Sequence, residues 1–145
     1  MPKVLIKKLD SAVILPAYKT SGASGMDLKA FIKKSICIKS KTSSIISTGL
    51  SVAFSQDFEI QIRPRSGLAA KNSISVLNTP GTIDSDYRGE IKIILYNHGD
   101  DDFIVNNGDR IAQMILAPVA KIELQETTNL PETIRGDGGF GSTGK

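Results

Sequence analysis

The chain has 145 residues, with 18 basic side chains against 15 acidic ones and a formal net charge of +3. This length predicts a single domain that buries its own core without disulfides or a structural metal. The charge is too small and too scattered to predict stable nucleic-acid binding, whereas small anionic ligands remain open.

The only cysteine, Cys37, lies in the apolar run Ile36–Ile38. A single cysteine cannot form a disulfide within the chain or supply a cysteine-based metal site, so we expect a reducing, cytoplasmic setting. Lysines interrupt the apolar residues of Met1–Lys8. We therefore expect neither a signal peptide nor a membrane span at this end.

Short apolar runs separated by turn residues dominate most of the chain. In Phe58–Ile62 every second side chain is apolar, which predicts a strand with one face on a core. Ser66–Lys71 is long enough for one or two helical turns. The pattern predicts an all-β sandwich or barrel. The apolar runs are Val4–Leu9, Val13–Leu15, Ile36–Ile38, Ile45–Ile46, Leu50–Phe54, Phe58–Ile62, Ile74–Leu77, Ile91–Tyr96, Phe103–Val105, Ile111–Leu116 and Val119–Leu124.

Arg63–Gly67 forms a polar cluster at the end of the alternating strand. If Ser66 and Gly67 open a helical turn, their N–H groups and the two arginines suit a phosphate. A surface loop held by salt bridges is the alternative. Farther along, Gln113 is the one candidate for a ligand contact in Arg110–Leu116, and His98 fits a solvated turn.

Thr82–Glu90 forms a second polar cluster, placed between the Pro80-Gly81 turn and an apolar strand. Asp84 and Asp86 are spaced so that both carboxylates can point the same way from an extended segment. A carboxylate there can accept a proton from water or hold a metal. The alternative is that both residues cap the turn.

The last ten residues, 136–145, contain five glycines and little that can be buried apart from Phe140. A disordered tail is one interpretation. A lid over a phosphate-bearing ligand is the other, because the segment offers many N–H groups, two hydroxyls and cations. Gly139–Lys145 also matches most of a nucleotide-binding P-loop, but it lacks the flanking strand and helix that this loop needs.

Five segments, taken in order, resemble the motifs of the homotrimeric dUTPase family along nearly the whole chain. They are Ala23–Ala30, Pro64–Ala69, Gly81–Gly89, Gly108–Ile115 and Arg135–Gly144. Departures are small: Met26 stands where the family often has another bulky residue, and Lys71-Asn72-Ser73 lacks the commoner aromatic or histidine variants.

The resemblance implies a β jelly-roll domain over residues 1–124 and a glycine-rich arm over 125–145 that closes as a lid. It implies a homotrimer with active sites shared among the chains, hydrolysing dUTP to dUMP and pyrophosphate. This reaction limits uracil incorporation into DNA and supplies dUMP for thymidylate synthesis. Asp84 would orient and deprotonate the water that attacks the α-phosphorus. Mg²⁺ would bind mainly through substrate phosphates and water, with Asp27 in a supporting, indirect role.

The resemblance also assigns the substrate contacts. The inner phosphate contacts would be Arg65, Ser66, Gly67 and Gln113. Uracil would lie in a hairpin pocket formed by Asn78, Gly81, Thr82, Ile83 and groups near Lys92. Tyr87 would pack on the sugar and exclude a ribose 2′-hydroxyl, and Phe140 would stack on uracil. The outer phosphates would be covered by Arg135, Gly141, Ser142 and Thr143.

Two other functions fit parts of the same pattern. A dCTP deaminase shares the fold, but Asp84–Tyr87 and the complete glycine-rich arm argue against it. A nucleotide-sensing or protein-binding module would keep the pocket and regulate a partner, although an intact Asp84 favours catalysis.

Overall fold

The computed structural model describes residues 1–141, which form eleven strands and one short helix. The strands are β1 (Leu5–Lys8), β2 (Met26–Lys29), β3 (Ile36–Ile38), β4 (Ser43–Ser47), β5 (Leu50–Ala53), β6 (Phe58–Arg63), β7 (Ile74–Val76), β8 (Gly81–Ile83), β9 (Lys92–Asn97), β10 (Phe103–Val105) and β11 (Arg110–Pro118). The helix α1 spans Ser66–Asn72, where the sequence predicts a helical turn. The prediction of an all-β fold is therefore confirmed.

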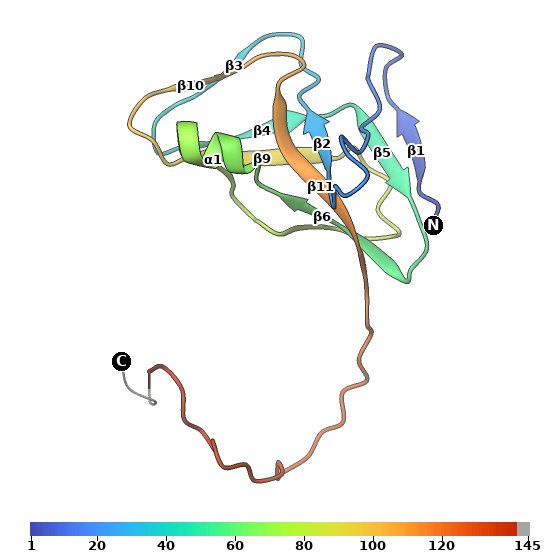
Figure 1. The fold of residues 1–145 in the computed structure, drawn as a ribbon, viewed down its shortest axis with the longest axis vertical. Helices are drawn as coiled ribbons and strands as arrows, with labels where there is room; N and C mark the ends of the chain where they lie inside the picture. Colours follow the sequence, from blue (N-terminus) through green and yellow to red (C-terminus); the bar gives the residue numbers. More distant parts are fainter. Residues whose placement is uncertain (142–145) are drawn as a thin grey trace.

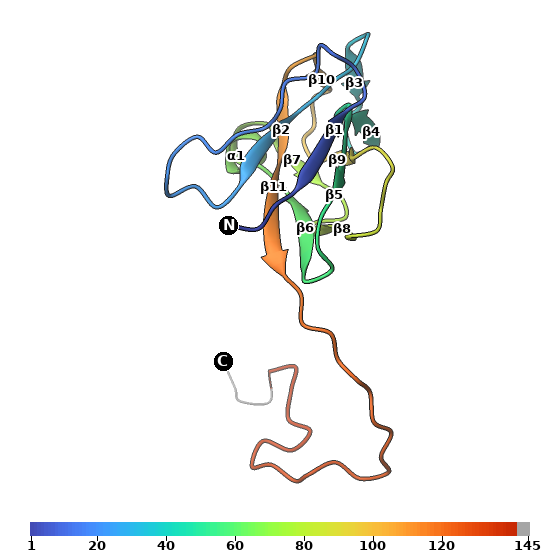
Figure 2. The same ribbon diagram turned by 90° about the vertical axis from the view of Figure 1, so that its right-hand side faces the viewer.

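The strands pair into a four-stranded sheet, a three-stranded sheet and two smaller pairs (Figures 1 and 2). The larger sheets have the orders β2-β11-β6-β8 and β4-β9-β7, and the smaller pairs are β1-β5 and β10-β3. All of these pairings are antiparallel. In residues 1–141 the strands thus make an open sandwich of separate sheets rather than a closed barrel.

Side chains from both large sheets fill one apolar core. The alternation in β6 works as predicted, because Ile60 and Ile62 are only 2% and 3% exposed whereas Glu59 and Gln61 face the other way. β9 contributes Ile93 from the opposite sheet. Burial of such aliphatic side chains is the main driving force for this arrangement.

Two apolar runs form no strand. Val13–Leu15 lies in a loop, with only Val13 buried. Val119–Leu124 follows the end of β11, and Val119 donates its N–H to Asp57 O as the last backbone bond to the sandwich. Beyond that bond the run has no neighbouring strand within residues 1–141, and Ile122 is 79% exposed. An apolar run forms a strand only where a partner strand satisfies its backbone groups.

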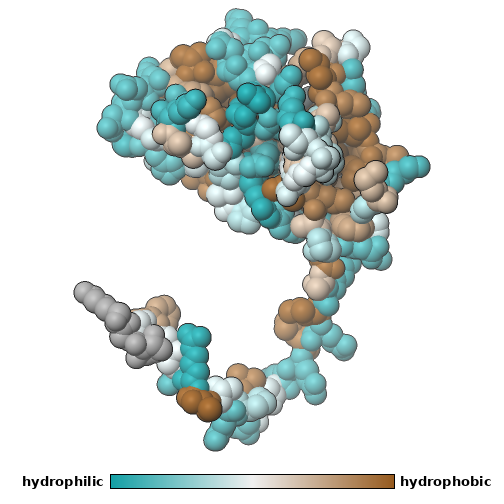
Figure 3. All heavy atoms as spheres, in the orientation of Figure 1, coloured by the Kyte–Doolittle hydropathy of each residue, from teal (hydrophilic) through white to brown (hydrophobic). Residues whose placement is uncertain are grey.

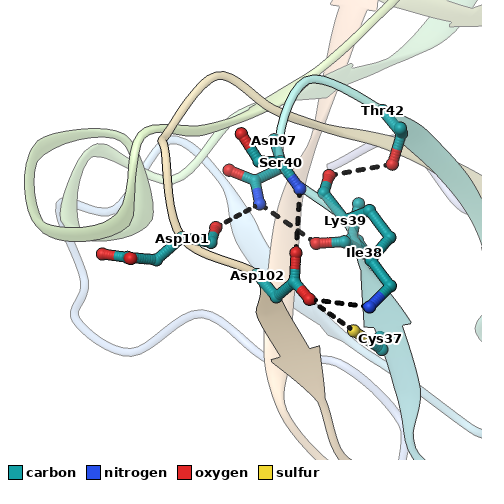
Figure 4. A network of polar contacts seen from close by, with 8 residues as sticks. All are labelled: Cys37, Ile38, Lys39, Ser40, Thr42, Asn97, Asp101 and Asp102. Carbon is teal, nitrogen blue, oxygen red and sulfur yellow. Dashed lines mark hydrogen bonds and ion pairs between the residues drawn. The ribbon is translucent and has the colours of Figure 1, made fainter.

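Asn97, at the end of β9, holds two loops together (Figure 4). Its side chain is fully buried, and its Nδ2 donates to Ile38 O at 3.0 Å and to Asp101 O at 2.8 Å. Its Oδ1 accepts the Gly99 N–H at 2.9 Å. One side chain therefore satisfies three backbone groups in the β3–β4 and β9–β10 connections.

A surface ion pair lies next to Asn97 in the same loops (Figure 4). Lys39 Nζ lies 2.9 Å from Asp102 Oδ2. This hydrogen bond lowers the pKa of the Asp102 carboxyl, to which Ser40 N also donates, and it raises the pKa of the Lys39 ammonium. Cys37, which is exposed rather than part of the core, directs its thiol at the same carboxylate.

Among residues 1–141, no helix is long and apolar enough to cross a membrane.

Candidate active site

The first group of predicted site residues lies where β6 runs into α1. Arg65 is the residue that precedes the helix, and its Nε donates to Asp27 Oδ1 at 2.8 Å. The second oxygen of Asp27 binds Arg110 at 3.2 Å. Asp27 and Arg65 are about four-fifths buried, which strengthens this pairing relative to a surface ion pair. The exposed Ser66 and Gly67 open the helix beside them.

The sheet register explains why this group assembles. Asp27 of β2 pairs with Gln113 of β11, and Gln113 pairs in turn with Arg63 of β6. Directly paired residues project to the same face of a sheet, so these three side chains share one face. Gln113 Nε2 donates to Pro64 O at 2.9 Å, which ties β11 to the segment before α1. The structure therefore brings Asp27, Arg65 and Gln113 together at one end of β6.

Gly25 lets Gln113 approach the first motif. A Cβ on Gly25 would lie 2.8 Å from Gln113 Oε1 and 3.3 Å from Met114 O. The first distance is closer than real Cβ atoms approach and the second is tight, so a side chain there would displace the Gln113 amide. Arg63 behaves differently, because its guanidinium donates to Gln61 along β6 rather than joining the group at the start of α1.

The second group lies on the turn that links β7 to β8, two strands that belong to different sheets, so the expected hairpin is a connection between sheets. This turn contains the exposed Asn78 and a cis Thr79–Pro80 peptide bond. Gly81 is buried, and a Cβ on it would lie 3.3 Å from both Asn78 Nδ2 and Ile62 Cβ. Thr82 follows it and is exposed, Ile83 is half-buried, and Lys92 is the exposed first residue of β9. The predicted pocket residues Asn78 and Gly81 are therefore in contact range of one another.

Asp84 leaves the end of β8 and opens a turn that Tyr87 closes, with Tyr87 N donating to Asp84 O at 3.1 Å. Asp84 and Asp86 are both exposed. They line an open groove of about 440 Å³ together with Gln56, Phe58, Glu59, Ser85, Val119 and Lys121. An exposed carboxylate in such a groove is free to bind water and accept its proton.

The two groups lie at opposite ends of β6. Because Ile83 pairs with Ile60, the next residue, Asp84, lies near Glu59 at the start of β6. Arg65 lies beyond Arg63 at the other end. Four residues of strand span about 13 Å. Within one chain, the predicted base and the predicted phosphate contacts are thus too far apart to act on the same phosphate.

The arm that follows β11 extends away from the sandwich (Figures 1 and 2). Within residues 122–141 every hydrogen bond is local to the arm, such as the bond from Arg135 Nε to Gly138 O at 2.9 Å. Phe140 is fully exposed, and Phe140 and Gly141 both have positive φ angles. The predicted contacts Ser142 and Thr143 lie outside the described residues.

The described residues offer no complete protein cage for a metal. Within residues 1–141, no three side chains of His, Cys, Asp or Glu converge on one point. Both oxygens of Asp27 are engaged by arginines. This donor set fits Mg²⁺ only if substrate phosphates and water supply most of its ligands, which is a common arrangement for this ion.

Two residues that contact these groups received no role from the sequence. Arg110 pairs with Asp27 although they are 83 positions apart. Glu90 accepts the Gly49 N–H at 2.9 Å and lies 3.8 Å from Lys92 Nζ. Both residues lie in or beside segments singled out in the sequence, but their partners depend on strand register, which the sequence does not display.

Comparisons with known proteins identify relatives of this chain. Residues 11–144 match the family model described as dUTPase. A protein from Rickettsia bellii named deoxyuridine 5′-triphosphate nucleotidohydrolase is 54% identical over 143 residues, covering 98% of this chain and 95% of that protein. A protein of the same name from a Hydrogenobaculum species is 51% identical over 142 residues, covering 98% of both chains.

Solved structures show the same fold at lower identity. A dUTPase of Staphylococcus bacteriophage 80alpha, solved with dUpNHpp, superposes with a TM-score of 0.87 at 20% identity, covering 99% of both chains. A dUTPase from phage phi11 of S. aureus, described with a structural Mg(II) ion, gives 0.80 at 17% identity, covering 90% of this chain and 99% of that one. These likenesses confirm the expected jelly-roll fold.

Proposed function

Because this chain belongs to the dUTPase family, we propose that three copies of it hydrolyse dUTP in active sites to which more than one copy contributes. The reaction yields dUMP and pyrophosphate, and with it the enzyme limits uracil incorporation into DNA and supplies dUMP for thymidylate synthesis. The proposal includes a cytoplasmic location, where nucleotide precursors are handled.

The separation along β6 is the observation that carries this proposal. Asp84 lies beside Glu59 at one end of β6, whereas Arg65 lies past the other end, about 13 Å or more away. Neighbouring phosphoryl groups of a triphosphate lie much closer together than that. A phosphate chain on Arg65 and Ser66 of one copy therefore needs the Asp84 of a different copy.

Exposed apolar surface supports assembly. Leu5, Leu9 and Ile14 are 65%, 49% and 69% exposed. They lie in or near the segment around β1, on the side where Figure 3 shows apolar side chains gathered. A groove of about 360 Å³, lined in part by Leu5, Leu9 and Val52, runs along the same strands. Contiguous apolar surface of this kind is typical of interfaces between subunits.

The chemistry assigned to the chain's own residues is water activation and phosphate binding. Asp84 orients a water molecule and takes its proton as the water attacks the α-phosphorus, which helps the rate by about 10²–10⁴. Arg65, Ser66, Gly67 and Gln113 hold the phosphates from the start of α1 and from β11. Asp27 keeps Arg65 in place through their ion pair.

Bound Mg²⁺ would supply positive charge that stabilises the charge on the triphosphate. Asp27 would contact it only through water, since arginines occupy both of its carboxylate oxygens. The remaining ligands of the ion would come from the substrate and from solvent.

Substrate selection is assigned to the β7–β8 turn with β8 and to the arm. Asn78 and the backbone of Gly81–Ile83, with groups near Lys92, read the polar edge of uracil, and mismatched donors penalise cytosine. Tyr87 packs on the deoxyribose. The arm of another copy closes over the site, with Phe140 stacking on the base and Arg135, Gly141, Ser142 and Thr143 covering the outer phosphates.

Pyrophosphate release from dUTP, dTTP, dCTP and UTP tests the assignment. With magnesium, the protein should turn over dUTP far faster than the other three nucleotides, and equal rates on all four would defeat the proposal. Asp84→Asn should retain dUTP binding and lose about 3–5 kcal/mol of transition-state stabilisation. Asp86→Asn is the matched control, because it removes a second exposed carboxylate from the same turn, and it should retain turnover.

A further inference from the structure

We propose that Gly89 and Glu90 are positioning residues that hold Tyr87 against the loop and thereby set the discrimination between deoxyribose and ribose. The inference rests on the proposed function, which places the Tyr87 ring on the sugar. It assigns the ring's position to two residues that do not themselves touch the substrate.

Gly89 leaves the space that the Tyr87 ring occupies. A Cβ on Gly89 would lie 2.3 Å from the Tyr87 hydroxyl oxygen and 2.5 Å from Cζ. Both distances are far inside van der Waals contact, so any side chain at position 89 must push the ring out of its place. The ring folds back over its own loop only because position 89 is glycine.

Glu90 holds the same hydroxyl end of the ring by a hydrogen bond. The Tyr87 hydroxyl donates to Glu90 O at 3.1 Å. The Glu90 carboxylate is about 20% exposed and accepts the Gly49 N–H at 2.9 Å. Gly49 needs its positive φ of 68° to make this turn, and a Cβ on it would lie 2.5 Å from Val13 Cγ2. The carbonyl that receives the phenol is therefore anchored to the buried β4–β5 turn.

The residue that follows Glu90 is fixed to the same turn. Ile91 N donates to Leu50 O at 2.8 Å, and Thr48 Oγ1 donates to Ile91 O at 2.6 Å. On the other side of the loop, Arg88 donates to Ser85 O at 2.7 Å and to Tyr87 O at 3.0 Å. The backbone on both sides of Tyr87 is thus held by hydrogen bonds.

These contacts predict a specific role because Tyr87 is 45% exposed, so burial alone does not fix its ring. Its position depends on the hydroxyl bond to Glu90 and on the space above Gly89. A ring that excludes a 2′-hydroxyl by contact must be placed to a fraction of an ångström, since a small displacement opens room for one oxygen atom. Loosening the ring should therefore admit UTP before it harms turnover of dUTP.

The test compares kcat/KM for dUTP and UTP in the full-length protein and in four variants. Gly89→Ala should raise the UTP-to-dUTP ratio by about tenfold or more, the scale on which a pocket discriminates one small group. Glu90→Ala should raise it in the same direction. Glu90→Gln keeps an oxygen that accepts the Gly49 N–H, so it should restore a ratio close to that of the unsubstituted protein.

Asp10→Ala is the control, because the Asp10 carboxylate also accepts a backbone N–H, but from Ala12 in its own turn, at 2.8 Å, rather than from the β4–β5 turn. It should leave both kcat/KM values unchanged. If Gly89→Ala does not fold, the comparison of Glu90→Ala with Glu90→Gln tests the inference. Equal losses on dUTP and UTP in the alanine variants would overturn the inference and leave the proposed function standing. An unsubstituted protein that does not hydrolyse dUTP would overturn the proposed function itself, and the inference with it.

Discussion

Replacing Asn97 with alanine should destabilise the sandwich more than any surface substitution. The change removes the side chain that joins the β3–β4 and β9–β10 connections (Figure 4). Three hydrogen bonds to Ile38 O, Asp101 O and Gly99 N disappear, and the residue is fully buried. Asp101 is exposed, so water can replace its lost partner, whereas Ile38 is buried and Gly99 is half-buried.

The magnitude follows from these partners. Each buried backbone group left without a partner costs about 1–3 kcal/mol, and the cavity left by the side chain adds to this. The expected loss in the free energy of unfolding is about 3–5 kcal/mol. Asn106→Ala is the control, since its side chain makes one exposed bond, from Ser35 Oγ at 2.6 Å. That variant should lose about 1 kcal/mol or less.

Urea unfolding measures the free energy of unfolding of both variants. One fixed protein concentration is used, because the stability of an oligomer depends on concentration. The amide of Gly99 should also exchange faster in Asn97→Ala, since it loses its acceptor. Turnover of dUTP by the folded variant should be unchanged, because Asn97 and Lys92 are at opposite ends of β9. A stability loss no larger than that of Asn106→Ala would refute the reasoning.

Three further variants test other parts of the structure. Gly49 has a φ of +68°, and a Cβ on it would lie 2.5 Å from a core methyl group, so Gly49→Ala should lower the free energy of unfolding by about 2–5 kcal/mol. Gly108 has a φ of +86° but open space around it, so Gly108→Ala should lower that free energy by only about 1–2 kcal/mol. Equal losses by urea unfolding would exclude the packing clash. The bond to Lys39 lowers the pKa of the Asp102 carboxyl, so the ionised carboxylate stabilises the folded protein at pH 7. Asp102→Asn should therefore be less stable than the unsubstituted protein at pH 7, and this difference should vanish as the pH falls below the carboxyl's ordinary pKa of 3.8. A difference that persists in acid would contradict this. Truncation before Arg135 should preserve the oligomer by size-exclusion chromatography yet abolish most dUTP turnover, and an unchanged rate would make the arm an idle tail.

Local patterns in the sequence predicted much of the fold. The alternation in Phe58–Ile62 predicted β6 and its buried face, because side-chain direction in a strand follows from residue spacing alone. Ser66 was correctly expected to open a helical turn. The all-β class followed from many short apolar runs. Each of these inferences uses residues that are neighbours in the chain.

The contacts that the sequence did not display are those between distant segments. Asp27 meets Arg110 only because β2 and β11 pair in one particular register. Val119–Leu124 has the apolar content of a strand, but within residues 1–141 no strand lies beside it. Its sequence alone therefore suggests a strand that the structure does not form. The roles of Gly89 and Glu90 likewise emerge only when the loop is folded onto the β4–β5 turn.

Mixing two inactive variants tests the shared active site most directly. Chains carrying Asp84→Asn lack the base, and chains ending before Arg135 lack the lid, yet each retains what the other lost. The two variants are unfolded together in equal amounts and refolded, so that mixed trimers form at random. A site is complete when its Asp84 comes from a truncated chain and its arm from an Asp84→Asn chain, which should hold for about a quarter of the sites. We predict that dUTP hydrolysis returns to about a quarter of the activity of the unsubstituted protein. Mixed trimers no more active than the two variants measured separately would contradict the account.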